Sequence, residues 1–173
     1  MHQTNAIQIH ADRRVIFETV SNLDNWPRLL PHYRWVKTLK QEADSRIVHM
    51  AARRGWIPIQ WTSRFWVDAE RCELHFRHLT AFTKGMTVVW TLTTTAEAVE
   101  VRIDHDLVLS WPLIGPFVAK NIIGRLFIHP VASRTLQSFK AHFEKQPVAQ
   151  ASLPADSSHG TQAGTPVLPK PSQ

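Results

Sequence analysis

Cysteine is almost absent from the 173-residue sequence, with Cys72 as its single example. One thiol cannot close an intramolecular disulfide and cannot build a multi-cysteine metal site. The ten histidines do not replace it, because none forms a close pair with a carboxylate on the same face of a helix or strand. His75 and His78 come nearest, but their odd spacing places them on opposite faces of a strand. We therefore expect no metal and no cofactor.

A long uninterrupted apolar run is also missing. The longest apolar stretch, residues 107–128, is broken by prolines, glycines and charged residues, so it does not resemble a membrane span. No apolar segment follows Met1, so we expect no secretion signal and a cytoplasmic protein. We expect one folded domain over residues 1–146. Residues 147–173 are rich in proline, serine and alanine and have no aromatic residue, which predicts a disordered tail.

Acidic residues are outnumbered: Lys and Arg total 20 against 14 Asp and Glu, for a net charge of +6. Such a balance suits an anionic partner. The basic residues are not gathered in one block and no nucleic-acid reader motif is present, so we expect no nucleic acid. An anionic membrane remains a possible partner, contacted transiently. The basic residues that would serve it are Arg13, Arg14, Lys37, Lys40, Arg53 and Arg54.

The order of elements follows from hydrophobic periodicity. Alternation over residues 4–11 predicts a strand, and Asp12 then stands at the N-cap position of an amphipathic helix. A short second helix is expected around Pro27 to Leu30, with Pro27 in its first turn and Pro31 limiting its end. Six period-two segments separated by turn residues predict an antiparallel meander. These are residues 33–39, 45–52, 56–68, 71–79, 85–94 and 98–109.

The last folded segment, residues 113–144, has the apolar spacing of one face of a long helix. Pro130 removes a backbone donor inside it, so we expect a kink or a restart near His129. Strand parity then assigns the inward side chains of the meander. Three polar residues, Ser63, His78 and His105, fall on otherwise apolar faces. Each needs a hydrogen bond, a water or a ligand, because an unpaired buried polar group costs roughly 1–3 kcal/mol.

Five stretches carry a resemblance to a known family. They are "VIFETVSNLDNWPRLLPHY" from Val15, "WTSRFWVDAERCELHFRHL" from Trp61, "GMTVVWTL" from Gly85, "VEVRIDHDL" from Val99 and "PVASRTLQSFKAHFE" from Pro130. Together they resemble the START-like (SRPBCC) superfamily, and in particular its polyketide cyclase and coenzyme Q-binding branch, over residues 4–144. The resemblance implies an α+β helix-grip fold. In that fold a curved, seven-stranded antiparallel sheet wraps around a long C-terminal helix, with two short helices after the first strand.

The resemblance implies one of two functions for the cavity of this fold. The first is binding of a hydrophobic small molecule (a lipid, isoprenoid or polyketide-like compound) as a carrier or chaperone. On this hypothesis Trp26 and Tyr33 lie at the mouth of the cavity. The walls and polar contacts come from Trp61, Ser63, Phe65, Phe76, His78, Met86, Trp90 and His105.

The second is a polyketide cyclase or dehydratase that uses His78 or His105 as general acid and base. In cyclases of this branch an arginine four residues after the tryptophan of the fourth strand acts inside the pocket. Phe65 occupies that position here, and Arg64 has the opposite parity. This departure argues against cyclase chemistry.

Overall fold

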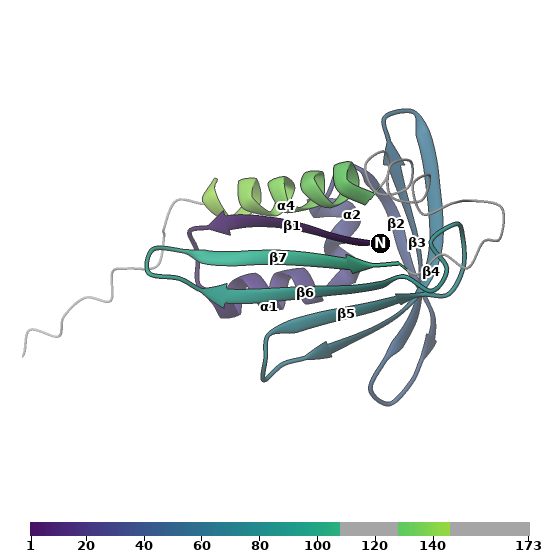
Figure 1. Cartoon of the computed structure of the whole chain (residues 1–173), viewed down its shortest axis with the longest axis horizontal. Coiled ribbons are helices and arrows are strands. Elements are labelled where there is room, and N and C mark those ends of the chain that lie inside the picture. The colour runs from purple at the N-terminus through teal and green to yellow at the C-terminus, as the bar shows by residue number, and fades with distance from the viewer. Residues whose placement is uncertain (108–127, 146–173) are drawn as a thin grey trace, which may run out of the picture.

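The computed structural model of the protein describes residues 1–107 and 128–145 (Figure 1). Within these residues seven antiparallel strands form one sheet in the order β1-β7-β6-β5-β4-β3-β2. The strands are β1 (His2–Ile9), β2 (Tyr33–Gln41), β3 (Arg46–Arg54), β4 (Ile57–Asp68), β5 (Glu73–His78), β6 (Thr87–Thr94) and β7 (Val99–Asp106). The helices are α1 (Arg13–Ser21), the 3-10 turn η1 (Leu23–Asn25), α2 (Trp26–Leu29) and α4 (His129–Glu144). This is the expected α+β helix-grip arrangement.

The connection from β1 to β2 forms as its sequence predicts. The Asp12 side chain caps α1 by accepting hydrogen bonds from the backbone N–H groups of Arg14 and Val15 at 2.9 and 3.0 Å. Pro27 lies in the first turn of α2, which ends at Leu29. This segment places Trp26 against the concave face of the sheet, where it meets Phe76 and Trp90.

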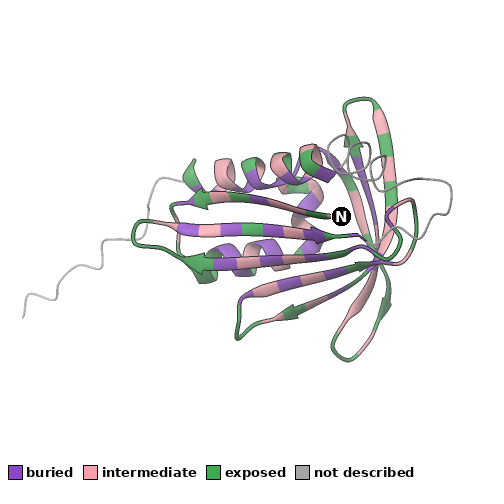
Figure 2. Cartoon of the chain, viewed as in Figure 1, coloured by how far each residue is buried: buried purple, intermediate pink, exposed green. Residues whose placement is uncertain are grey.

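The six predicted strands of the meander are confirmed to within two residues at each described end. The last two residues of the final predicted strand, 108 and 109, lie outside the described residues. Burial alternates along β5, β6 and β7 as period-two patterning requires (Figure 2). Val67 is the exception on β4, because it belongs to the inward parity but is 43% exposed at the strand's end.

A β-bulge between Tyr33 and Trp35 reverses the parity of β2. Tyr33 is buried on the concave face, and Val36, paired with the buried Met50, continues that face. The Trp35 ring instead meets His49 at 4.7 Å, on the opposite side of β3 from Met50. Parity alone would have placed Tyr33 and Trp35 together, and the extra residue of the bulge separates them.

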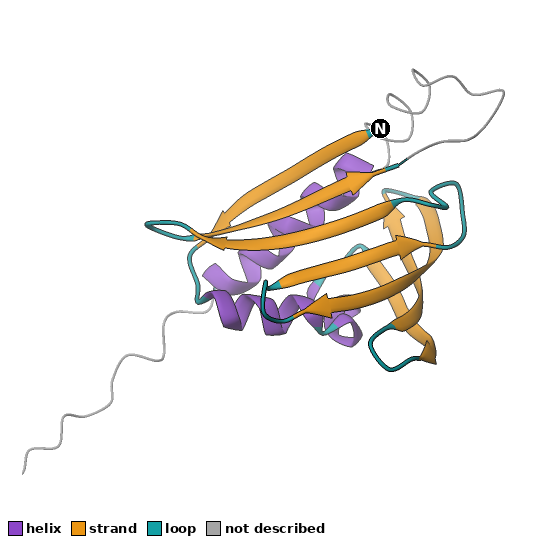
Figure 3. Ribbon diagram, turned by 60° about the horizontal axis from the view of Figure 1, so that its bottom comes forward, coloured by secondary structure: helices purple, strands orange, loops and turns teal. Residues whose placement is uncertain are grey.

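The C-terminal helix α4 begins at His129 with Pro130 in its first turn, where the sequence predicts a kink or restart. The earlier part of that predicted helix, residues 113–127, lies outside the described residues, as does the predicted tail. Figure 3 shows the helices gathered on one face of the curved sheet. There α4 buries Leu136, Phe139 and Phe143. None of the helices in the described part of the chain is long and apolar enough to cross a lipid bilayer.

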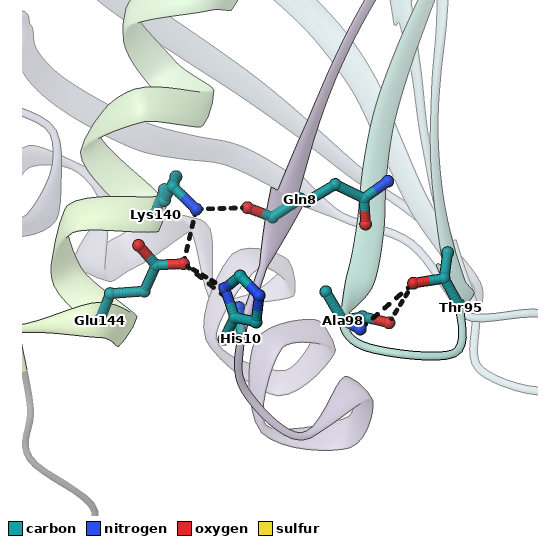
Figure 4. A network of polar contacts seen from close by, with 6 residues as sticks. All are labelled: Gln8, His10, Thr95, Ala98, Lys140 and Glu144. Carbon is teal, nitrogen blue, oxygen red and sulfur yellow. Dashed lines mark hydrogen bonds and ion pairs between the residues drawn. The ribbon is translucent and has the colours of Figure 1, made fainter.

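Both ends of α4 are fastened to β1. At the C-terminal end Lys140 Nζ donates to the Gln8 carbonyl at 2.7 Å and contacts Glu144 at 2.6 Å, while Glu144 accepts from His10 (Figure 4). These contacts hold the pKa of Glu144 at about 2. At the other end the Asn5 amide donates to Ser133 Oγ at 2.8 Å. The helix is thereby held in register along the first strand.

Candidate functional site

A cavity lies between the concave face of the sheet, α2 and the first turns of α4. Its volume is about 100 Å³. At about 10–15 Å³ for each water, this space far exceeds a single hydration site. The described lining is apolar apart from Tyr33, His78, Thr83, His105 and the Trp N–H groups. The cavity therefore has the composition of a binding site for a small apolar molecule.

His78 ends β5 and marks one polar position in the cavity. Its Nδ1 forms a 2.7 Å hydrogen bond with Thr83 Oγ1, and its ring stacks on Trp61 with centroids 5.8 Å apart. The β5–β6 turn brings Thr83 back to it: Met86 N–H donates to the Thr83 carbonyl, and Gly85 N–H to the His78 carbonyl. Gly85 has a φ of +89°, which favours glycine at this position. Burial, and secondarily the nearby His105, lower the pKa of His78 to about 3.

His105 lies on β7 and is 7% exposed. Within the described residues its Nδ1 has no hydrogen-bond partner. Burial lowers its pKa to about 4, against smaller opposing effects from the Gln3 backbone and from Asp104 and Asp106. Those two aspartates do not face it, since Asp106 pairs with His2 at 2.8 Å and Asp104 accepts from Thr4. His105 therefore lines the cavity as a neutral imidazole, and its buried Nδ1 has no partner among the described residues.

Trp26 and Tyr33 form an inner wall of the cavity and not its mouth, which corrects the expectation from the sequence. Trp26 is 2% exposed, and its indole N–H donates to the Val20 carbonyl at 2.9 Å. Its ring meets Tyr33 edge-on at 5.1 Å and lies 5.6 Å from Trp90. Burial raises the pKa of Tyr33, against a smaller opposing effect of a hydrogen bond with Thr135. This wall is continuous with the hydrophobic core.

Eight of the ten residues expected to contact a ligand line the cavity. They are Trp26, Tyr33, Trp61, Phe76, His78, Met86, Trp90 and His105. Ser63 and Phe65 share the inward face of β4 but lie off the cavity lining. Phe65 packs on Phe76 and beneath Arg46, whose guanidinium reaches Asp24 of η1 at 3.3 Å. Arg46 therefore links the η1 turn to the side of the sheet that carries Phe65.

Sequence reasoning missed several lining residues. Ile59, Val88 and Ile103 have the inward parity and could have been added by it, as could Met50 on β3. Phe82 and Thr83 lie in a turn, where no periodicity marks a side chain as inward. Ile128, Val131 and Ala132 come from the start of α4.

A third buried histidine, His32, contacts the Tyr33 wall of the cavity. His32 Nε2 forms a 2.8 Å hydrogen bond with Thr135 Oγ1, and the His32 ring meets Tyr33 at 5.0 Å. Burial, and secondarily the charge of Arg134, lower the pKa of His32 to about 4. His32 thus connects Tyr33 in the cavity wall to Thr135 of α4.

The described cavity lining holds no carboxylate, lysine or arginine. Arg64 is exposed and contacts Glu42 at 3.5 Å, so it faces away from the cavity as its parity predicts. Across residues 1–107 and 128–145 no three His, Cys, Asp or Glu side chains come together as metal ligands. The side chains of the site can therefore offer apolar contact and hydrogen bonds, without a fixed charge at neutral pH.

Residues 9–144 match the model of a family described as polyketide cyclase / dehydrase and lipid transport. A comparison with curated protein sequences finds no match. Among solved structures, a protein from Thermus thermophilus superposes with a TM-score of 0.70 at 12% identity, covering 84% of this chain and 98% of that one. The Zhui aromatase/cyclase from a Streptomyces species gives 0.69 at 15%, covering 84% and 94%. A START superfamily protein from Mycobacterium smegmatis gives 0.63 at 13%, covering 83% and 97%. At these identities the structures show a common fold.

Proposed function

Because this chain belongs to the polyketide cyclase / dehydrase and lipid transport family, we propose that it binds an uncharged hydrophobic small molecule in the cavity, as a carrier or chaperone. The observation that carries the proposal is the apolar, aromatic lining that includes His105, whose buried Nδ1 has no hydrogen-bond partner in the described part of the chain. A ligand with one hydrogen-bonding group would satisfy that atom, and its apolar part would contact Trp61, Phe76 and Trp90.

The polar group of the ligand should be uncharged. His78 and His105 have pKa values of about 3 and 4, so both are neutral at pH 7. A carboxylate or phosphate in the cavity would lose its hydration without meeting a cation in the described lining. A hydroxyl, ketone or quinone oxygen loses less hydration, and it can pair with a neutral imidazole.

The same pKa values weigh against the cyclase or dehydratase alternative. Neither histidine supplies an imidazolium as general acid near pH 7, and a neutral imidazole with so low a pKa is a weak general base. Phe65 occupies the position of the cyclase arginine, and Arg64 faces solvent. The likeness to Zhui supports a shared fold and does not carry its activity to this chain.

Filling the cavity should prevent binding. Ala132 is buried on α4 and lines the cavity, so Ala132→Phe places a ring in the space that a ligand needs. The neutral fluorophore N-phenyl-1-naphthylamine should bind the wild-type protein and bind this variant about tenfold or more weakly. Fluorescence titration measures both dissociation constants.

Ala141→Phe is the matched control, since Ala141 is on the same helix, half-buried and absent from the described lining. It should retain the wild-type dissociation constant. Equal binding by all three proteins would place the fluorophore outside the cavity, and absence of binding by the wild-type protein would contradict the proposed function. Solvent extracts of the purified proteins, analysed by mass spectrometry, should contain an apolar compound with the wild type and Ala141→Phe but not with Ala132→Phe.

Ligand charge should matter more than ligand shape. At pH 7.5 we expect 2-naphthol to displace the fluorophore at a concentration about tenfold below that of 2-naphthoate, because the carboxylate must be desolvated. Methyl 2-naphthoate has the same ring system without the charge and should recover the affinity. Tighter binding of the naphthoate would show a cationic site and contradict the uncharged class.

A further inference from the structure

The β3–β4 turn presents a large apolar side chain to solvent. Trp56 is 84% exposed, the most exposed of the large hydrophobic residues in the described structure. Arg54 pairs with Ile57, so Gly55 and Trp56 alone make the turn, and Gly55 has a φ of +59°. Figure 1 shows this turn projecting from the sheet at the top of the view. The fold itself gains little from an indole in this position.

Positive charge accompanies Trp56. Arg53 and Arg54 precede the turn, and Arg53 is exposed. From Ser45 to Val67, which covers the β3–β4 hairpin up to its last residue, Asp68, the sequence contains no Asp or Glu. The neighbouring β5–β6 turn adds exposed Lys84, and no acid occurs from Leu74 to Ala96. The surface around Trp56 is therefore aromatic and basic.

This end of the sheet also leads to the cavity. Ile59, three residues beyond Trp56 on β4, lines it, as does Phe82 of the β5–β6 turn. The two segments are joined where Thr62 N–H donates to Thr80 Oγ1 at 2.9 Å and Leu79 N–H donates to the Thr62 carbonyl at 2.7 Å. Only two residues of β4 therefore separate the β3–β4 turn from the first lining residue of that strand.

We propose that the β3–β4 turn docks on an anionic lipid bilayer, with Trp56 in the interfacial layer and Arg53 and Arg54 at the lipid headgroups. Tryptophan prefers this layer because its ring is apolar while its N–H can still pair with water or lipid oxygens. Basic residues close to such a surface are attracted by its negative potential. A two-residue turn can enter the interface without unfolding its strands. The inference goes beyond ligand binding and does not depend on it.

Sedimentation with phosphatidylcholine vesicles, with and without phosphatidylserine, tests the proposal. The wild-type protein should sediment with the anionic vesicles and much less with the neutral ones. Trp56→Ser should lower the partition coefficient on anionic vesicles about tenfold. Arg53→Glu should lower it about fivefold or more, since it replaces an attractive charge with a repulsive one.

Leu39→Ser is the matched control, because Leu39 is 59% exposed and lies near the opposite end of the β2–β3 hairpin from Ala52 and Arg53. It should sediment like the wild type. Equal losses for Trp56→Ser and Leu39→Ser, or equal sedimentation with neutral and anionic vesicles, would overturn the proposal. Trp56→Ser should keep the wild-type affinity for N-phenyl-1-naphthylamine, so failure of membrane docking and failure of ligand binding are distinguishable.

Discussion

Trp26→Ala should lower the free energy of unfolding by about 3–5 kcal/mol, the range observed when a buried tryptophan or phenylalanine is truncated. Trp26 is 2% exposed and its ring meets Tyr33, Phe76, Trp90 and Phe139 at centroid distances between 5.1 and 6.0 Å. The substitution also leaves the buried Val20 carbonyl without its indole donor. Since the void would open onto an existing cavity, we expect little compensating collapse.

Urea denaturation followed by circular dichroism measures this loss. Trp26→Phe should recover much of it by restoring ring contacts without the hydrogen bond. Trp56→Ala removes the same side chain from an exposed turn and should change the stability by less than about 0.5 kcal/mol. A loss below about 1 kcal/mol for Trp26→Ala would show that the stability of the core does not depend on the Trp26 ring.

Acidification should destabilise the protein steeply below pH 6.5. The pKa values of His32, His78 and His105 are lowered to about 4, 3 and 4 in the folded state. Unfolding returns each to about 6.5, so between those limits the unfolded chain binds more protons than the folded one. The stabilisation is full above pH 6.5 and is lost as the pH falls toward 4. Three such groups give a slope of up to about 4 kcal/mol per pH unit, since each contributes at most about 1.4.

The slope of the free energy of unfolding against pH is measured by urea denaturation between pH 7 and pH 5. Carboxylates with ordinary pKa values titrate below this range, so the slope reports the histidines. His78→Gln, His105→Gln and His32→Gln should each flatten the profile by about 1.4 kcal/mol per pH unit at most, whatever they do to stability at pH 7. A flat profile for the wild-type protein would mean that these three histidines are accessible to protons in the folded state.

Local rules were sufficient for most of the fold. Alternation in β5, β6 and β7 survives because each strand has one face on the core and one in solvent, so parity reports burial directly. Asp12 and Pro27 sit where helix starts require them. The bulge after Tyr33 could not be read in this way, since one extra residue reverses parity without leaving a compositional mark.

The candidate site was recovered to the extent that it lies on strands. Parity found His78 and His105, but it does not show where along a strand the cavity ends, so Ser63 and Phe65 were included although they lie off the cavity lining. Thr83 depends on the path of a turn and His32 on packing against α4. The contacts of Thr83 with His78 and of His32 with Thr135 depend on tertiary structure, which strand parity does not describe.

The pairing of β1 with β7 determines when the sheet can be completed. His2 pairs with Asp106 and Ile9 with Val99, whereas β2 to β7 join consecutive neighbours through short turns. At about 5–20 residues per second, a ribosome needs on the order of 10 s to make the partner of β1. Strands β2 to β7 can pair with their neighbours as they leave the ribosome. The first strand, β1, has no partner until β7 has been made, and α4 can pack on β1 only after that. Long-range closure of this kind slows folding, so the nascent chain keeps an unpaired strand edge that a chaperone could bind.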